Sequence, residues 1–379
     1  MQTVAEELAQ WPRRLPARLQ VGRVADRRRL ASPDQNQILC FRRGQWCRLI
    51  SGAHHGFIRR FGELHRSPPL LGFLCNRFDA SCARFVPTSS FRLPNAVRRR
   101  SWRAVHSGHG RVLLRHSSYR GGRERDDGLV VWDPITDEQR ELSKRPMRCE
   151  PFKWSWNAAV LCAAGGGCNH GDCHRGPFVV VFVGTINRET FSCVYSSEAD
   201  GWSEPVSDRL PYDYCFDPLS VGDLVGNSLY FMYDMMSHQG ILEYDLLTQE
   251  MSAIPVPARG TVLMATEDGR LGLATVHKSR LYLWSREQGP YGDAGWAQSR
   301  VIELDTLFSI HRLSAAEALV AGFGDNGAGG VIFVRTAAAF FTIDLKSGRV
   351  DKVGESHGFN NLVVPYMSFC TPGTELIHL

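Results

Sequence analysis

One short segment recurs five times along this chain, and its recurrence limits the possible fold more than any other feature. Each copy begins with a run of mostly apolar residues, and this run ends in an Asp or a Ser. Val, Ile, Tyr, Phe and Trp suit a pleated, half-buried strand, and an Asp at its end can accept hydrogen bonds from the backbone of a tight turn. The copies lie at residues 129–142, 191–198, 241–248, 281–287 and 340–347.

An apolar run of strand length precedes each copy, so each pair predicts a β-hairpin. The partner runs lie at residues 110–114, 178–183, 227–231, 269–273 and 330–334. The Asp or Ser that ends each copy recurs at intervals of roughly 50 residues, which is the period of kelch-type propeller blades. The pattern therefore predicts a mainly β chain that folds as a six-bladed kelch-like β-propeller. A seven-bladed ring and an open β-sandwich are the alternatives.

The sixth blade is predicted from segments at both ends of the repeat region. Residues 70–74 and 83–86 provide two apolar runs before the first copy, and residues 362–369 provide one after the last copy. A blade that is shared between the two ends would close the ring and remove free sheet edges.

The repeated positions are expected to serve the fold rather than chemistry. The residues that end the five strands should cap turns; they are Asp133, Ser196, Asp245, Ser285 and Asp344. The three carboxylates occupy equivalent places in different blades, so they do not predict a catalytic set. The aromatic residues before the turns should pack in the core rather than form a ligand cage; they are Trp132, Tyr195, Tyr244 and Trp284.

The N-terminal part of the chain differs from the rest in charge. Residues 1–66 contain 13 Arg and 5 acidic residues, although the whole chain carries a net charge of only +5. This shift predicts a boundary between a basic, poorly ordered segment at 1–37, two helices within 38–66, and a propeller at 67–379. The basic segment is either a solvated arm or a surface for nucleic acid or an import receptor. Because no aromatic residues alternate with Arg27, Arg28 and Arg29, we expect no nucleic acid partner.

The 11 cysteines are scattered, and the N-terminus lacks the apolar region of a secretory signal. Most should therefore be free thiols in the reducing cytoplasm or nucleus. Cys168, His170, Cys173 and His174 are residue types that zinc prefers, but they all lie within seven positions, which hinders tetrahedral closure. A Gly-rich loop without metal is the favoured interpretation, and the zinc site is its alternative.

The chain lacks three common motifs of catalytic and phosphate-binding sites. It contains no Gly-x-Ser-x-Gly, no His-Glu-x-x-His and no Gly-x4-Gly-Lys-Ser/Thr. It also has no apolar run of about 20 residues that could span a membrane. The sequence therefore predicts a non-enzymatic protein with no cofactor and no membrane contact. Residues 119–127, which are rich in Arg and Gly, are expected to form an exposed hairpin loop.

A series of segments resembles the large F-box family of plants that carries a C-terminal β-propeller. The resemblance covers roughly residues 38–372. Its segments include WCRLIS at 46–51, GFIRRF at 56–61, HRSPPLLGF at 65–73, VWDP at 131–134, PFVVVFVG at 177–184, GWS at 201–203 and VPYMSF at 364–369. The resemblance implies a substrate-recognition subunit of an SCF-type cullin–RING ubiquitin ligase, in which the propeller binds the target protein.

The resemblance also implies where an adaptor would bind. A Skp-type adaptor would contact the helical segment at 38–66, and the candidate contact residues are Trp46, Leu49, Ile50, Phe57 and Phe61. The Leu-Pro-Asp/Glu-Leu start and the amphipathic first helix of this family have no counterpart in residues 1–37, so the first half of the F-box is missing or degenerate. The alternative is a propeller that binds a partner protein without any ligase.

Overall fold

The fold is described from a computed structural model. The structure describes residues 37–42, 45–50, 70–77, 82–87, 99–100, 102–120, 123–144, 156–163, 173–186, 189–208, 215–216, 221–234, 239–288, 294–308, 318–324, 330–356 and 359–367. Almost all of these residues lie in antiparallel sheet. The only helical elements among them are the short α3 (Leu304–Phe308) and the 3-10 turn η2 (Cys173–Arg175). No helix within the described ranges has the length and apolar character needed to cross a membrane.

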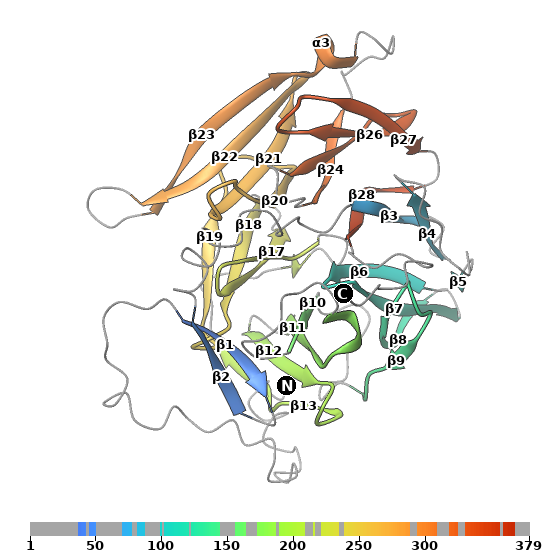
Figure 1. The fold of residues 1–379 in the computed structure, drawn as a ribbon, viewed down its shortest axis with the longest axis vertical. Coiled ribbons are helices and arrows are strands. Elements are labelled where there is room, and N and C mark those ends of the chain that lie inside the picture. Colours follow the sequence, from blue (N-terminus) through green and yellow to red (C-terminus); the bar gives the residue numbers. More distant parts are fainter. Residues whose placement is uncertain are drawn as a thin grey trace, which may run out of the picture.

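Six small sheets, the blades, surround a common centre (Figure 1). Blade 1 contains β28 (Phe359–Met367), β3 (Leu70–Arg77), β4 (Cys82–Pro87) and β5 (Arg99–Arg100). Blade 2 contains β6 (Trp102–Gly108), β7 (Arg111–Arg120), β8 (Arg123–Trp132) and β9 (Gln139–Glu141). Blade 3 contains β10 (Trp156–Cys162), β11 (Phe178–Ile186), β12 (Glu189–Ser196), β13 (Gly201–Trp202) and β14 (Val206–Asp208).

The other three blades follow in chain order. Blade 4 contains β15 (Cys215–Phe216), β16 (Asp223–Val225), β17 (Ser228–Asp234), β18 (Gln239–Asp245) and β19 (Met251–Pro255); β15 and β16 both pair with β17 and together form the first strand of this blade. Blade 5 contains β20 (Thr261–Ala265), β21 (Leu271–His277), β22 (Arg280–Gln288) and β23 (Ala294–Glu303). Blade 6 contains β24 (Leu319–Gly324), β25 (Val331–Arg335), β26 (Ala339–Asp344) and β27 (Val350–Glu355). One parallel bridge, between Cys82 and Trp102, links the sheets of blades 1 and 2.

The hydrophobic core lies between the blades. Successive side chains of a strand point to opposite faces of its sheet, so each inner strand packs against both neighbouring blades. In β7, Val112 and Leu114 face blade 1, whereas Leu113 faces blade 3. The same division gives six buried clusters, one at each interface. They include Leu113 with Tyr195, Val181 with Phe231, Ile241 with Leu273, Leu283 with Ile332, Phe73 with Phe333, and Leu114 with Tyr366.

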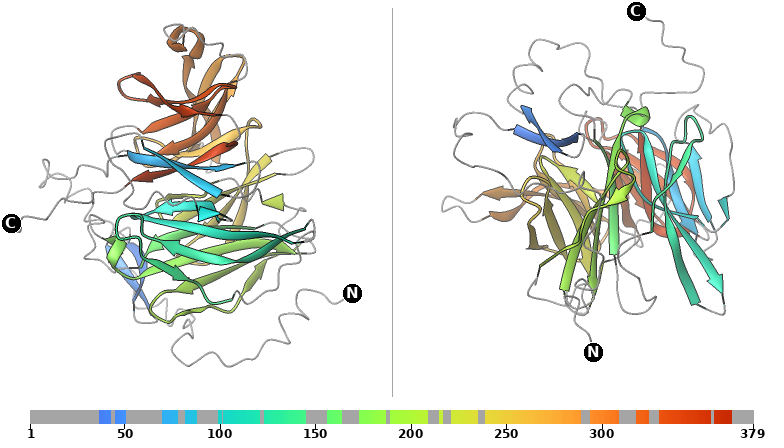
Figure 2. Two further views of the ribbon diagram at one scale, coloured as in Figure 1. Left: turned by 90° about the vertical axis from the view of Figure 1, so that its right-hand side faces the viewer. Right: turned by 90° about the horizontal axis from the view of Figure 1, so that it is seen from below.

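The ring closes inside blade 1, as the sequence predicts. The last described strand, β28, pairs antiparallel with β3, with Val364 opposite Leu74. Figure 2 shows light-blue β3 beside red β28 in both views. The six-bladed propeller is therefore confirmed, and all five predicted partner runs are the second strands of blades 2 to 6.

Three local predictions were wrong. Residues 38–50 do not form a helix: β1 (Gln37–Arg42) and β2 (Gln45–Ile50) pair as an antiparallel hairpin. β-Branched and aromatic residues on both sides of Gly44 favour strands, and Gly disfavours a helix. The second predicted helix lies outside the described residues, as does the segment at 1–36.

The predicted loop at 119–127 is mostly strand. The pairing of β7 with β8 continues to Arg120 opposite Arg123, past an irregularity between His116 and Ser117. In the third case, Ser285 does not end a strand. It lies inside β22, opposite Gly272, because blade 5 has longer outer strands than the other blades.

Candidate functional site

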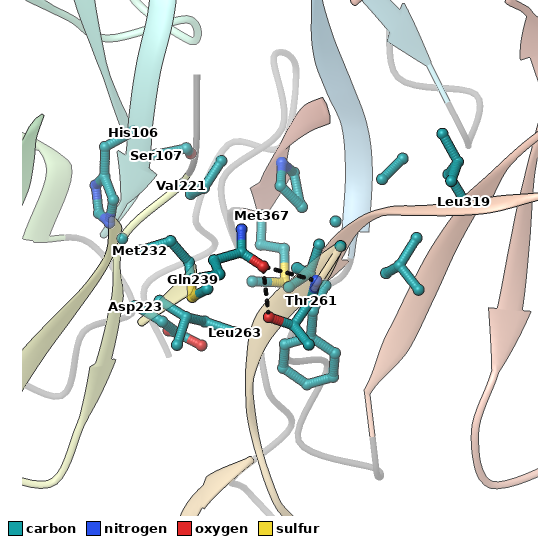
Figure 3. A pocket seen from close by; sticks show the side chains of 18 residues that line it. His106, Ser107, Val221, Asp223, Met232, Gln239, Thr261, Leu263, Leu319 and Met367 are labelled. Carbon is teal, nitrogen blue, oxygen red and sulfur yellow. Dashed lines mark hydrogen bonds between the residues drawn. The ribbon is translucent and has the colours of Figure 1, made fainter. Parts of the chain in front are cut away.

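A cavity of about 280 Å³ lies where the innermost strands converge. It is lined by residues on or beside β6, β16, β17, β18, β20, β24 and β28, which belong to five of the six blades (Figure 3). We call it the central cavity. Its apolar lining includes Val221, Met232, Leu263, Phe323 and Met367. This volume is close to the smallest typical volume of a small-molecule site, which is about 300 Å³.

The central cavity also presents a small number of polar groups. They are the His106 imidazole, the hydroxyls of Ser107 and Thr261, the Asp223 carboxylate and the Gln239 carboxamide. Among the described lining residues, Asp223 is the only carboxylate, and none is Lys or Arg. The described part of the lining therefore offers no cationic group to an anionic ligand.

The orientation of the Gln239 carboxamide follows from its neighbour across the blade interface. The backbone nitrogen of Thr261 lies 3.4 Å from Gln239 Oε1, and Thr261 Oγ1 lies 3.3 Å from the same atom. A backbone N–H can only donate, so the facing atom must be the carbonyl oxygen. The amide nitrogen is thus turned away from Thr261. In Figure 3 it points to the other side of the Gln239 side chain.

His106 is part of the cavity wall and is not poised for acid–base chemistry. Burial lowers the pKa of its imidazole to about 3, and the nearby His109 contributes to the same direction. The ring is therefore neutral at ordinary pH. Its Nδ1 accepts a hydrogen bond from the Val160 backbone nitrogen at 3.2 Å, which ties β6 of blade 2 to β10 of blade 3.

The repeated aspartates cap turns, as the sequence predicts. Asp133 Oδ1 accepts from the backbone nitrogens of Ile135 (2.8 Å) and Thr136 (3.3 Å). Asp245 makes the same pair of contacts, to Leu247 (2.7 Å) and Thr248 (2.8 Å).

The third aspartate and one of the two serines follow the same pattern. Asp344 Oδ1 accepts from both the backbone nitrogen and the hydroxyl of Ser347, each at 2.7 Å. Ser196 Oγ accepts more weakly from the Ala199 backbone nitrogen (3.4 Å). Ser285 instead donates to Glu287 Oε1 at 3.2 Å within its strand, so the predicted turn cap at Ser285 was wrong.

The aromatic residues before these turns are core residues. Trp132, Tyr195 and Tyr244 are buried, and Trp284 packs against the core between blades 4 and 5. Two of them also reach the turn that follows. Trp132 Nε1 donates to Asp137 Oδ1 (2.9 Å), and the Tyr195 hydroxyl donates to Asp200 Oδ1 (2.5 Å). Asp137 and Asp200 both have positive φ, so each contact fixes the most constrained residue of its turn.

Only part of the Cys/His-rich segment is described by the structure. Cys173 and His174 are buried in η2, whereas Cys168 and His170 lie outside the described residues. His174 Nε2 lies 3.8 Å from Asp133 Oδ2, and Arg111 donates to the Gly176 carbonyl. These contacts attach the β10–β11 connection of blade 3 to blade 2. No group of three metal-ligating residues occurs among the described residues, and the zinc alternative stays a prediction.

Three of the five predicted adaptor-contact residues lie in a strand and not in a helix. Trp46, Leu49 and Ile50 belong to β2, and Phe57 and Phe61 lie outside the described residues. Sequence reasoning missed the central cavity altogether. Its lining comes from residues that are separated by up to about 260 positions, and none of them forms a local motif.

Comparison with known proteins identifies no family. No protein-family model matches the chain, and no curated protein matches it. Among solved structures, the chain is similar to a protein of unknown function from Bacteroides caccae, at 10% identity and a TM-score of 0.47, over 79% of this chain and 99% of that chain.

Two further structures have lower TM-scores. The propeller domain of the trilobed protease from Pyrococcus furiosus matches at 10% identity and a TM-score of 0.36, over 76% of this chain and 99% of that chain. TolB from Acinetobacter baumannii matches at 11% identity and a TM-score of 0.38, over 81% and 68% of the respective chains. We draw no functional argument from similarities at this level.

Proposed function

We propose that this chain is a non-enzymatic protein-interaction module, which binds a partner protein through the loops of its propeller. The proposal is supported chiefly by the use of the repeated carboxylates. Asp133, Asp245 and Asp344 each have an oxygen that accepts two hydrogen bonds from its own turn. These repeated carboxylates therefore serve the scaffold, and the function that we propose for the ring is recognition at its surface loops.

This function is tested by affinity capture with the full-length chain under reducing conditions, in extracts of the source cells. We expect a partner protein at a fixed stoichiometry that survives high-salt washing and reconstitutes a complex from two purified components. The purified chain should turn over no substrate in hydrolase and oxidase screens. Failure to reconstitute any binary complex would contradict the proposal, and so would catalytic turnover.

A second candidate is the F-box role in an SCF-type cullin–RING ligase. It is favoured by the ordered series of segments that resembles plant F-box propeller proteins, from WCRLIS at 46–51 to VPYMSF at 364–369. In this role the chain would perform no bond chemistry, but would raise the effective concentration of target lysines near the conjugating enzyme. The hairpin of β1 and β2 replaces the first expected helix and weighs against it.

Co-expression with a Skp-type adaptor separates the two candidates. In the favoured interaction-module role, the full chain elutes without the adaptor, whereas an intact F-box protein binds it in the same assay. Stoichiometric co-elution that is lost in Leu49→Asp but kept in Val301→Asp, a substitution on the exposed outer strand β23, would instead support the ligase role. Both roles suit a protein of the cytoplasm or nucleus.

A further inference from the structure

We propose that the central cavity binds an uncharged carboxamide group on a short apolar stem. This inference goes beyond partner binding by the loops, because it concerns the inside of the ring. It starts from the Gln239 side chain, which enters the cavity from β18 of blade 4.

The Gln239 carboxamide is oriented before any ligand arrives. Its Oε1 accepts two long hydrogen bonds from Thr261, on β20 of the neighbouring blade, and these set which way the carboxamide faces. None of the described residues accepts a hydrogen bond from its Nε2, which Figure 3 shows turned away from Thr261. An oriented amide donor beside largely apolar walls favours a ligand that presents a carbonyl acceptor over one that is wholly apolar.

The other lining groups restrict the class of ligand further. The carboxylate of Asp223, on β16, and the absence of Lys and Arg among the described lining residues disfavour a carboxylate or phosphate ligand. A ligand amide can accept from Gln239 and donate its own N–H to an oxygen of the lining, such as Ser107 Oγ. An ammonium ligand offers no acceptor to Gln239 Nε2 and would have to bind through the Asp223 carboxylate instead.

The apolar walls complete the site. Met232 and Met367 lie on opposite sides of Gln239 in Figure 3, and Leu263 lies below it. Thioether side chains adapt to an alkyl or aryl stem. The cavity volume of about 280 Å³ limits the stem to a few carbon atoms or one ring. A free small amide and the side chain of a partner's Gln or Asn share this chemistry.

The test uses the full chain with its methionine methyl groups labelled with ¹³C. Butyramide and benzamide are the probes, and butyrate and n-butylammonium are the charged controls. We expect saturable shifts of the Met232 and Met367 methyl signals with the amides in the millimolar range, and at least fivefold weaker binding of both charged compounds. The Met251 signal, from a buried residue that does not line the cavity, should stay unchanged.

A substitution then isolates the amide donor. Gln239→Glu keeps an oxygen for the Thr261 donors but replaces the Nε2 donor with a charged acceptor, so butyramide affinity should fall at least fivefold. Gln298→Glu, on the exposed strand β23, makes the same chemical change away from the cavity and should have no effect. Binding of butyrate or n-butylammonium as tight as that of the amides, unchanged butyramide affinity in Gln239→Glu, or no saturable shift with either amide would each overturn the proposal.

Two capped peptides distinguish the possible sources of the amide. Acetyl-Ala-Gln-Ala-amide should shift the same methyl signals if a partner's side chain enters the cavity, with acetyl-Ala-Glu-Ala-amide as its control. A response to butyramide without a response to the peptide assigns the site to a free small molecule. The cavity result is independent of partner capture, so either proposal can fail while the other stands.

Discussion

A single carboxylate oxygen holds the turn after the third strand in blades 2, 4 and 6. In each case a Thr or Ser three positions later accepts from the backbone nitrogen two positions beyond it, at 3.3 Å. The residue four positions after the Asp then adopts positive φ; it is Asp137, Gln249 and Gly348 in the three blades. The recurring Asp and hydroxyl are therefore one local device, which fixes the chain direction between a blade's third and fourth strands.

Removing this oxygen should destabilise the fold measurably. We expect Asp245→Ala to lower the free energy of unfolding by about 1–2 kcal/mol, because the backbone nitrogens of Leu247 and Thr248 lose their acceptor. Urea unfolding measures the change. Asp245→Asn keeps one acceptor oxygen and should lose less. Ser285→Ala, whose serine does not cap a turn, should stay within about 0.5 kcal/mol of the wild type. Equal losses in Asp245→Ala and Ser285→Ala would refute the capping role.

Asp200 should make stability depend on pH. The hydrogen bond from Tyr195 and then that from Arg140 lower the pKa of Asp200 below its ordinary value of 3.8. The folded protein therefore holds this proton less tightly than the unfolded chain. The carboxylate adds stability above pH 3.8, and this contribution is lost as the pH falls through the folded-state pKa.

The corresponding variant is Asp200→Asn. The side chain is 70% exposed, so we expect a loss of about 0.5 kcal/mol at pH 7. The difference in stability between the variant and the wild type should shrink below pH 3.8. It should vanish once Asp200 is protonated in both the folded and the unfolded wild type. Thermal unfolding across pH 2–7 measures it. A difference that persists unchanged at pH 2 would show that the carboxylate charge is not responsible.

At the scale of strands, the sequence predicts those elements that recur with a regular period and are marked by neighbouring residues. Each inner hairpin is marked by an apolar run, a turn signal and a second apolar run, so the second and third strands of blades 2 to 6 could be located from residues alone. The outer strands could not, because β9, β13 and β27 are short or polar and are fixed by pairing with their neighbours. In blade 5, β22 continues past the repeat position to Gln288 and stays paired with the long β23, which explains why Ser285 was misplaced.

The candidate site was less predictable than the strands. The turn caps were recognised because an Asp or a Ser recurs at the end of each apolar run. The central cavity combines single residues of five blades, such as Ser107, Gln239 and Met367, and each of them is unremarkable within its own strand. Their proximity depends on the order of blades around the ring, which no local pattern encodes.

The contact between the first and last blades offers a test of core packing. Phe73 of β3 is fully buried, and its ring lies 5.0 Å from that of Phe333 and 5.7 Å from that of Phe340, both in blade 6. We expect Phe73→Ala to lower the free energy of unfolding by about 3–5 kcal/mol, whereas Phe73→Leu should cost about 1.5 kcal/mol or less. Thermal and urea unfolding check both. A loss below about 1 kcal/mol in Phe73→Ala would mean that this interface contributes little.

For the whole molecule, the closure of the ring should matter more than any one hairpin. Leu74 and Val364 lie opposite each other in β3 and β28, so a Leu74→Cys/Val364→Cys disulfide would enclose nearly the whole propeller. Chain-entropy arguments give such a cross-link about 5–6 kcal/mol, against about 3 kcal/mol for a link across one hairpin. An Ile241→Cys/Ile254→Cys pair in blade 4 provides that hairpin control.

Each cross-linked variant is compared with its own reduced form, so the effect of the substitutions cancels. The melting temperature should rise more on oxidation of the ring-closing pair than on oxidation of the hairpin pair. Mass spectrometry of peptides confirms which thiols are joined. An equal or smaller rise for the ring-closing pair would indicate that the pairing of β28 with β3 contributes less to global unfolding than its loop length implies.

The pairing of β28 with β3 also imposes an order on biosynthesis. During translation, β3 and β4 leave the ribosome long before β28, and the five intervening blades can form as they emerge. Until β28 has been synthesised, it cannot cover Phe73 and Leu74 of β3. Both side chains are buried in the complete propeller. Nascent chains stalled before residue 359 should therefore be held by chaperones, and those that expose residue 367 should be released from them.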